Sequence, residues 1–169
     1  TRKESSAASD VYKRQEWGVA DFACAAIGAV VVPVYETDSA RQTAGIVEEV
    51  DPAIAFAGDF QRAQTLEQIR VNHPGMKYVF NFKADGLDAV VDFGHGVSDE
   101  TLDAAIARIK ADDLLTVVYT SGSTGKPKGA MLSNRNYTHI VLNGYEILRG
   151  MLYDDNRCLL YTSPSPRDA

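Results

Sequence analysis

Residues 114–132 read LLTVVYTSGSTGKPKGAML, and this stretch carries more structural information than any other part of the sequence. The apolar and β-branched residues at 114–119 predict a strand. The glycines, hydroxyl residues and lysines that follow predict a loop. After the apolar residues 130–132, either Ser133 or Asn134 can cap a helix. The stretch therefore predicts a strand, a polar loop and a helix in succession.

Almost every residue of this loop can bind phosphate or let the main chain approach it. Gly122, Gly125 and Gly129 permit positive φ and close contact with a ligand, and successive backbone N–H groups can form an anion-binding nest. Lys126 and Lys128 add two positive charges, and charge-assisted hydrogen bonds are roughly twice as strong as neutral ones. Rotatable hydroxyl donors come from Thr120, Ser121, Ser123 and Thr124. The loop is thus a candidate site for a phosphate-bearing ligand.

Two other interpretations of the loop explain its composition less well. A flexible linker rich in glycine, serine and threonine would not open directly from an apolar strand and carry two lysines around Pro127. The phosphate-binding loop of P-loop nucleoside triphosphatases needs a glycine where Thr120 stands and a serine or threonine where Pro127 stands. Both required positions differ, which excludes that motif.

The segment from Thr120 to Gly129 resembles the phosphate-binding signature of the adenylate-forming superfamily. That signature reads Thr/Ser-Ser/Thr-Gly-Ser/Thr-Thr-Gly-x-Pro-Lys-Gly, and residues 120–129 satisfy every position. The superfamily includes acyl-CoA synthetases, luciferases and the adenylation domains of peptide synthetases. Residues 28–37, GAVVVPVYET, are similar to a segment of long-chain fatty acid synthetases. One departure is Asn134, which stands where the family often has histidine.

The resemblance implies a two-step reaction with ATP, Mg²⁺ and coenzyme A. A carboxylate attacks the α-phosphate of ATP, pyrophosphate leaves, and the acyl-adenylate reacts with the thiol of coenzyme A. The loop would hold the β- and γ-phosphates, Lys126 would contribute by charge alone, and Thr120 would reach the magnesium ion. The phosphate-binding residues expected on this basis are Thr120, Ser121, Gly122, Ser123, Thr124, Gly125, Lys126, Lys128 and Gly129.

Other parts of the family's active site have no counterpart in the sequence. These parts are a downstream glutamate, the adenine and ribose pocket, the acyl tunnel and a C-terminal domain with a catalytic lysine. We therefore assign no catalytic residue and expect the isolated chain to be inactive. Two alternatives stay open. The chain could be a fragment of another adenylate-forming enzyme, namely an aryl-CoA ligase or a peptide-synthetase adenylation domain, or it could be a phosphate-binding module without catalysis.

Strands alternate with helices of about ten residues along the rest of the chain. This alternation predicts an α/β fold, a mostly parallel sheet flanked by helices. By resemblance the fold would be part of the large N-terminal domain of an adenylate-forming enzyme. Residues 85–96 are expected to form a surface connection. The predicted strands are 30–34, 54–57, 78–82 and 114–119, and the predicted helices are 21–29, 38–50, 62–71 and 98–109.

The two ends of the chain resemble translated adapter DNA from a transposon-based sequencing library. Residues 5–15 read SSAASDVYKRQ and residues 158–168 read CLLYTSPSPRD. We therefore expect residues 1–15 and 158–169 to be non-native tails and residues 16–157 to be a partial AMP-binding domain.

Composition limits the partners that the chain can have. The net charge of −6 over 169 residues argues against nucleic acid and anionic membrane surfaces as partners. The two cysteines, Cys24 and Cys158, show no metal-ligand spacing. No secretory signal or membrane-spanning run is visible, so a cytoplasmic location is expected. The resemblance allows peripheral membrane association of the parent enzyme, and the oligomeric state stays open.

Overall fold

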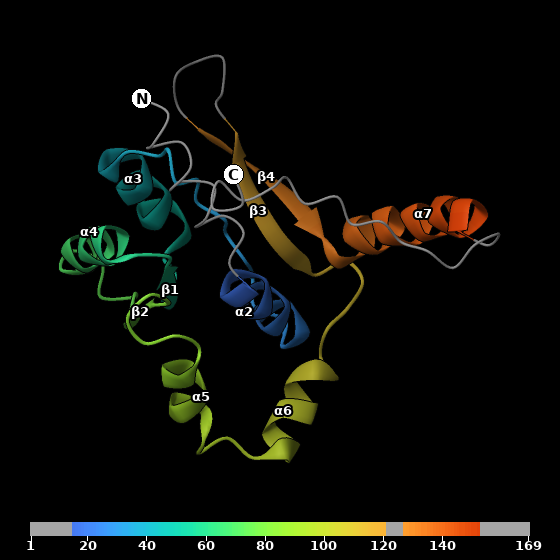
Figure 1. Ribbon diagram of the computed structural model, residues 1–169, viewed down its shortest axis with the longest axis horizontal. Helices are drawn as coiled ribbons and strands as arrows, with labels where there is room; N and C mark the ends of the chain where they lie inside the picture. The colour runs from blue at the N-terminus through green and yellow to red at the C-terminus, as the bar shows by residue number, and fades with distance from the viewer. Residues whose placement is uncertain (1–14, 121–126, 153–169) are drawn as a thin grey trace, which may run out of the picture.

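The computed structural model of the chain describes residues 15–120 and 127–152 (Figure 1). Within these ranges helices and strands alternate from residue 40 to residue 94, as the sequence predicts, whereas two helices or two strands follow one another elsewhere. The elements are α2 (Gln15–Ala26), α3 (Ala40–Val50), β1 (Ile54–Ala57), α4 (Phe60–Arg70), β2 (Tyr78–Asn81), α5 (Asp88–Gly94), α6 (Asp99–Ile106), β3 (Leu114–Thr120), β4 (Lys128–Ser133) and α7 (Asn134–Leu152).

Strands β1 and β2 form a parallel pair, with Ala55 opposite Val79 and Phe56 opposite Phe80. Helices α3 and α4 cover one face of this pair (Figure 1). The core between them centres on Val47, Ile69 and Met76, with Ala44, Ala55, Leu66 and Val79 packed around it. A parallel pair joined by a helix is the arrangement that alternating strands and helices predict. The α/β class is confirmed.

The other face of β1 and β2 carries aromatic side chains. The rings of Phe56 and Phe80 stack with their centroids 5.8 Å apart, and Phe56 also stacks on Phe82. Phe93 of α5 meets the Tyr78 ring edge-on at 4.5 Å. The predicted surface connection at residues 85–96 does lie at the surface, with no buried residue, but it contains the short helix α5, which was not predicted. A helix of seven residues is too short to show a periodic pattern.

Side-chain caps begin three of the helices at or near the predicted positions. Ser39 and Gln42 form a capping box at the start of α3, with each side chain accepting from the other residue's N–H. Asp59 caps α4 and Ser98 caps α6 in the same way, through a side-chain oxygen. Asp51, with φ of 41°, ends α3 in the left-handed conformation. Local polar groups therefore set these helix boundaries.

Helix α2 lies earlier in the chain than the predicted range 21–29. The N–H of Gly28 donates to Ala25 O at 3.1 Å, and that of Ala29 donates to Cys24 O at 2.9 Å. Gly28 has φ of 76°, so this C-terminal turn is a Schellman motif that requires glycine. The helix stops before Gly28 for that reason.

Strands β3 and β4 form an antiparallel hairpin, in which Val118 pairs with Ala130 and Thr120 pairs with Lys128. The predicted strand at 30–34 is wrong in extent, because Val31 alone pairs there, in a parallel bridge to Thr116. The Val31 N–H donates to Leu115 O at 3.0 Å and Val31 O accepts from the Val117 N–H at 3.1 Å. Two residues further on, Pro33 has no N–H with which to extend the ladder.

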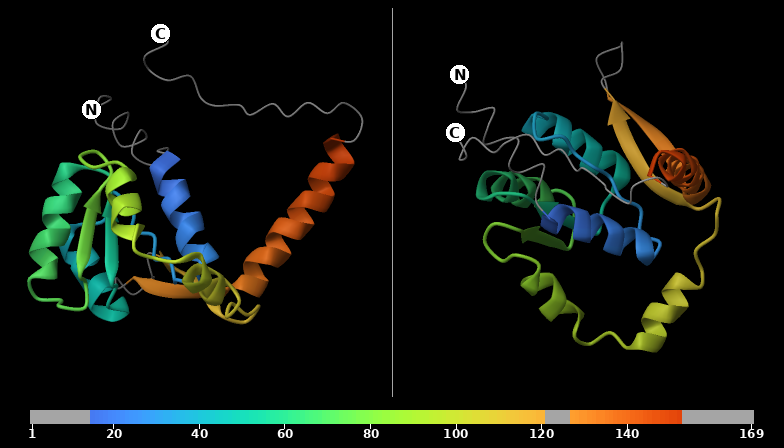
Figure 2. Two further views of the ribbon diagram at one scale, coloured as in Figure 1. Left: turned by 90° about the horizontal axis from the view of Figure 1, so that it is seen from below. Right: turned by 45° about the vertical axis from the view of Figure 1, so that its right-hand side comes forward.

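Helix α7 follows the hairpin directly and extends away from the helices that cover β1 and β2 (Figure 2). Its first turn is capped by Ser133, whose Oγ accepts from the Asn136 N–H at 3.3 Å, while the Asn136 side chain accepts from the Ser133 N–H at 3.0 Å. The predicted cap at this position is confirmed. In the described ranges 15–120 and 127–152, no helix is both long and apolar enough to cross a membrane.

Candidate phosphate-binding site

Three of the predicted phosphate-binding residues, Thr120, Lys128 and Gly129, lie at the adjoining ends of the paired strands β3 and β4. Thr120 is the last residue of β3, Lys128 is the first residue of β4, and the two are paired. Gly129 pairs with Tyr119 one position further from the turn. The other predicted residues, Ser121, Gly122, Ser123, Thr124, Gly125 and Lys126, lie outside the described residues. The hairpin thus brings Thr120 and Lys128 together from eight residues apart.

Gly129 has a steric reason to be glycine. A Cβ atom at this position would lie 2.7 Å from Cγ1 of Val117 and 3.3 Å from Cζ of Tyr119. Both side chains belong to the opposite strand β3 and cross over the glycine. Any larger residue would push the two strands apart next to Lys128. Position 129 therefore needs glycine because the facing side chains leave no room for a Cβ. It does not need glycine for a positive φ, which Gly129 does not adopt.

Thr120 and Lys128 both expose their side chains at the end of the hairpin. The Thr120 hydroxyl donates to the Lys128 carbonyl over 3.5 Å, a long and weak contact. Among the described residues, no carboxylate lies within ion-pair distance of the Lys128 ammonium. Both groups can therefore turn toward an anionic ligand without breaking a strong contact.

The opposite end of the hairpin is tied to the start of α7. The Asn134 side chain donates to the carbonyls of Lys110 and Asp113 at 3.1 and 3.4 Å. Arg135 makes a bidentate pair with Asp112, with distances of 2.7 and 3.0 Å. This hydrogen-bonded guanidinium holds the pKa of the Asp112 carboxyl below its usual range. Asn134, where the superfamily often has histidine, thus anchors α7 to the segment before β3.

Tyr119, predicted only as the last residue of the strand at 114–119, is the one buried residue of the described hairpin, at 4% exposure. Burial raises the pKa of the Tyr119 hydroxyl, and the negative charge of Glu49 raises it further. The sequence predicted the strand, but it gave no signal that Glu49, seventy residues earlier, would act on this tyrosine.

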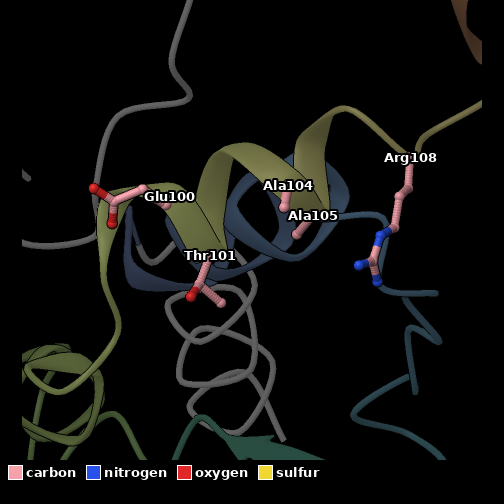
Figure 3. A pocket seen from close by; sticks show the side chains of 5 residues that line it. All are labelled: Glu100, Thr101, Ala104, Ala105 and Arg108. Carbon is pink, nitrogen blue, oxygen red and sulfur yellow. The ribbon is translucent and has the colours of Figure 1, made fainter.

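A hollow of about 380 Å³ lies along α6, lined by Glu100, Thr101, Ala104, Ala105 and Arg108 (Figure 3). Helix α6 precedes β3, so this hollow is at the end of the hairpin opposite Thr120 and Lys128 (Figure 1). Over residues 15–120 and 127–152, no cluster of three or more histidine, cysteine or acidic side chains could hold a metal ion. The hairpin end, rather than the hollow, adjoins the signature residues.

A family model described as AMP-binding enzyme matches residues 2–165. The chain belongs to the AMP-binding enzyme family. The predicted resemblance to adenylate-forming enzymes is thereby confirmed. The paired strands β3 and β4 accordingly lie within a domain of this family.

Curated relatives of this AMP-binding chain include long-chain fatty acid–CoA ligases. Long-chain-fatty-acid–CoA ligase FadD15 of Mycobacterium tuberculosis is 32% identical over 151 residues, which cover 88% of this chain and 25% of that protein. Long-chain-fatty-acid–CoA ligase 1 of Cavia porcellus is 33% identical over 137 residues, covering 73% of this chain and 20% of that protein. The predicted similarity to this subfamily is confirmed. The chain spans about a quarter of the length of these relatives.

Solved structures confirm the fold of the AMP-binding domain. ATP-bound MatB from Rhodopseudomonas palustris superposes with a TM-score of 0.60 at 24% identity, over 81% of this chain and 26% of that chain. A putative long-chain-fatty-acid CoA ligase from the same species gives a TM-score of 0.59 at 17% identity, over 81% and 33% of the two chains. At these identities the likeness concerns the backbone arrangement alone.

Proposed function

We propose that this chain is the ATP phosphate-binding part of a long-chain fatty acid–CoA ligase. The observation that supports the proposal is the complete signature at residues 120–129 in a chain of the AMP-binding family, with its described residues Thr120, Lys128 and Gly129 on the paired strands β3 and β4. The hairpin pairs Thr120 with Lys128, so one hydroxyl and one ammonium project at the end from which the signature residues continue. The names of the relatives support the long-chain assignment.

In the proposed reaction the fatty acid carboxylate attacks the α-phosphate of ATP, and pyrophosphate leaves. The thiol of coenzyme A then attacks the acyl carbon of the adenylate, forming the thioester as AMP leaves. Fixed donors that face the leaving phosphates are the main catalytic means available to such a loop. Lys128 supplies the charge, and the hydroxyls and N–H groups of the signature supply hydrogen bonds. Lys126 contributes positive charge alone.

Thr120 is the residue that we assign to Mg²⁺. Its exposed hydroxyl makes only a 3.5 Å contact within the hairpin, so it fits a role as one oxygen ligand. Mg²⁺ commonly takes one or two protein ligands and completes its shell with phosphate oxygens and water. A bound Mg²⁺ would offset negative charge on the phosphates. The donor set of the described residues therefore suits a metal ion that arrives with ATP.

The remainder of the proposal concerns parts of the enzyme outside this chain. The adenine, acyl and coenzyme A sites and the catalytic lysine belong there, so the isolated chain is expected not to form thioesters. A cytoplasmic enzyme that contacts membranes peripherally is consistent with a substrate of long acyl chains. Its partners are then small molecules, namely ATP, fatty acid and coenzyme A, and not nucleic acid.

Direct binding to the 169-residue chain tests the phosphate-binding role. Isothermal titration with magnesium pyrophosphate should give weak binding, with a dissociation constant of about 1 mM. Lys128→Ala should weaken binding about tenfold, because one charge-assisted contact is lost. The matched control is Lys77→Ala, which removes an equally exposed charge beside β2. Equal affinities in the Lys128→Ala and Lys77→Ala variants would refute the role of the hairpin end.

A chimera tests the catalytic part of the proposal. In FadD15 of Mycobacterium tuberculosis, the segment aligned over 151 residues is replaced by the corresponding residues of this chain. The chimera should form palmitoyl-CoA from palmitate, ATP and coenzyme A, and Lys128→Ala should lower this rate about 100-fold. A chimera that still binds pyrophosphate but forms no palmitoyl-adenylate would overturn the assignment to a ligase.

A further inference from the structure

Helix α7 carries apolar side chains along one face. Ile140, Val141 and Tyr145 lie three, four and eight positions after Tyr137, a spacing that places all four on the same side of a helix. Their exposed fractions range from 44% to 64%. The apolar face of a helix in a folded protein is normally buried against other elements. The α7 face, defined by these four residues, is therefore an uncovered surface in the described part of the chain.

The opposite side of α7 is polar. It carries His139, Asn143 and Glu146, and its Arg135 pairs with Asp112. Helices that lie on an anionic membrane surface are rich in lysine and arginine on their polar side. Helix α7 has no lysine, its Arg135 is already paired, and Glu146 adds negative charge. The α7 face is thus better suited to a protein surface than to a membrane.

Helix α7 has little to pack against among the described residues. Its main contacts are with β4 and β3, and it extends away from the helices that cover β1 and β2 (Figure 2). Strands β3 and β4 contribute a single buried residue in their described parts, Tyr119. Helices in proteins owe most of their stability to the packing of an apolar face. Helix α7 therefore needs a covering layer that the described elements do not supply.

The proteins that this chain matches are much longer than the chain. The matched region covers 25% of FadD15 of Mycobacterium tuberculosis and 26% of MatB from Rhodopseudomonas palustris. About three quarters of each protein therefore lie outside the region that corresponds to this chain. That length is ample for a layer that covers the α7 face.

A second copy of the chain is a weaker candidate for the covering layer. Standard interfaces between separate proteins involve about 20–30 residues a side, whereas the α7 face offers four. Two separate molecules also lose translational and rotational freedom when they associate, which a segment of the same polypeptide does not. Docking within one polypeptide is therefore favoured.

We propose that the α7 face is an internal interface of the intact ligase, covered by an apolar surface from the part of the polypeptide outside this chain. The choice of this occupant rests on the proposed function, because it takes the intact protein to be a ligase as long as FadD15. Since α7 follows β4 directly, this docking also holds the β3–β4 hairpin in place.

The experiment measures how fast a thiol reacts on each side of α7. Val141→Cys places a thiol on the α7 face, and His139→Cys is the matched control on the polar side, both at positions exposed in this chain. Each variant is made in the 169-residue chain and in the FadD15 chimera described above. A smaller graft, residues 134–152 alone in FadD15, gives the same measurement if the larger chimera does not fold. Labelling by N-ethylmaleimide is followed at each site by peptide mass spectrometry, and the molecular mass by analytical ultracentrifugation.

In the 169-residue chain the two variants should react at similar rates, and the chain should sediment as a monomer. In the chimera, Val141→Cys should react more slowly than His139→Cys by about tenfold or more, because a buried thiol reacts only after local opening. Equal rates in the chimera and in the smaller graft would overturn the proposal. So would a Val141→Cys reaction that slows with rising concentration of the 169-residue chain, which identifies a second copy as the occupant. Slowing that requires anionic lipid vesicles would overturn it in favour of a membrane.

The labelling rates need no ligand, so they separate this inference from the proposed function. If Val141→Cys is protected in a chimera that binds no magnesium pyrophosphate, the phosphate-binding role fails and the interface stands. If the chimera binds magnesium pyrophosphate while Val141→Cys and His139→Cys react equally fast, the phosphate-binding role stands and the interface is wrong.

Discussion

The region around β1 and β2 and the region formed by β3, β4 and α7 are built in different ways. The first has helices on one face of a parallel pair and a ladder of aromatic rings on the other. Eight of its residues are buried, namely Thr43, Ile46, Val47, Ala57, Ile69, Met76, Asn81 and Phe82. In the second region, Tyr119 is the single buried residue among those described. The proposed phosphate-binding residues belong to the region with the smaller core.

This difference indicates where the hairpin obtains its stability. A two-stranded hairpin is marginal in water without packing against other elements. The hairpin is joined to other elements by the Val31 bridge to Thr116 and by the Asn134 contacts to the preceding segment. Ligand-binding segments are commonly drawn from the less stable parts of a fold. The variants below test whether the two regions respond separately.

The largest effect is expected from Met76→Ala in the first region. Met76 is 1% exposed at the centre of the core with Val47 and Ile69, so truncation leaves a cavity. The free energy of unfolding should fall by about 2–5 kcal/mol, measured by urea denaturation followed by circular dichroism. The comparison variant is Met131→Ala in β4, where the side chain is 69% exposed and a change below about 0.5 kcal/mol is expected. Similar losses in both variants would show that the second region has a core of its own.

The next largest effect is expected from Gly129→Ala in the hairpin. The new methyl group would meet Val117 at 2.7 Å and the Tyr119 ring at 3.3 Å, which forces the strands apart. The hairpin should be destabilised by about 1–3 kcal/mol. Amide hydrogen exchange should therefore become faster in β3 and β4 and change little in β1 and β2. Gly144→Ala in α7 is the control, because a Cβ there meets no atom within 4 Å. That variant should stabilise the helix by about 0.5–1 kcal/mol. If amide exchange is unchanged in Gly129→Ala, the hairpin accommodates the added methyl group without loss of stability.

A smaller effect is expected from removing helix caps in the two regions. Ser39→Ala removes the cap of α3, where the Gln42 N–H lies 3.3 Å from Ser39 Oγ. It should lower the free energy of unfolding by about 1 kcal/mol, because α3 packs on the core. Ser133→Ala removes the matching cap of α7 and should accelerate exchange in the first turn of α7 while leaving the unfolding midpoint unchanged. If both variants lower the midpoint equally, the two regions unfold as one unit.

The smallest effect is expected from Asp112→Asn, which removes the exposed ion pair with Arg135. Arg135 lowers the pKa of Asp112, so the pair stabilises the folded state above the unfolded pKa of about 3.9. The contribution is lost as pH falls through the still lower folded pKa. Melting temperatures should therefore differ slightly between the variant and the unmodified chain at pH 7 and should converge below that folded pKa. Asp103→Asn, an exposed change on α6, should show no such difference at either pH.

The elements that the sequence predicts correctly are those with strong local signals. Residues 54–57 form β1 as predicted, because five apolar residues, Ala53 to Ala57, lie between Pro52 and the Gly58–Asp59 turn. The caps at Ser39 and Ser98 follow from hydroxyls placed directly before helical segments. The predictions that are wrong depend on distant partners. The apolar segment at 30–34 has one paired residue, and α5 depends on an aromatic contact between Phe93 and Tyr78.

The sequence alone determined the family of this protein and the chemistry of its proposed site. Glycines, hydroxyls and lysines at fixed spacing act through local backbone freedom and side-chain donors, which are readable without a partner. Tertiary structure alone decided that Thr120 pairs with Lys128, that Val117 and Tyr119 leave no room for a side chain at 129, and that Val31 bridges to Thr116. The Val31 bridge joins residues 85 positions apart, and only folding brings such residues together.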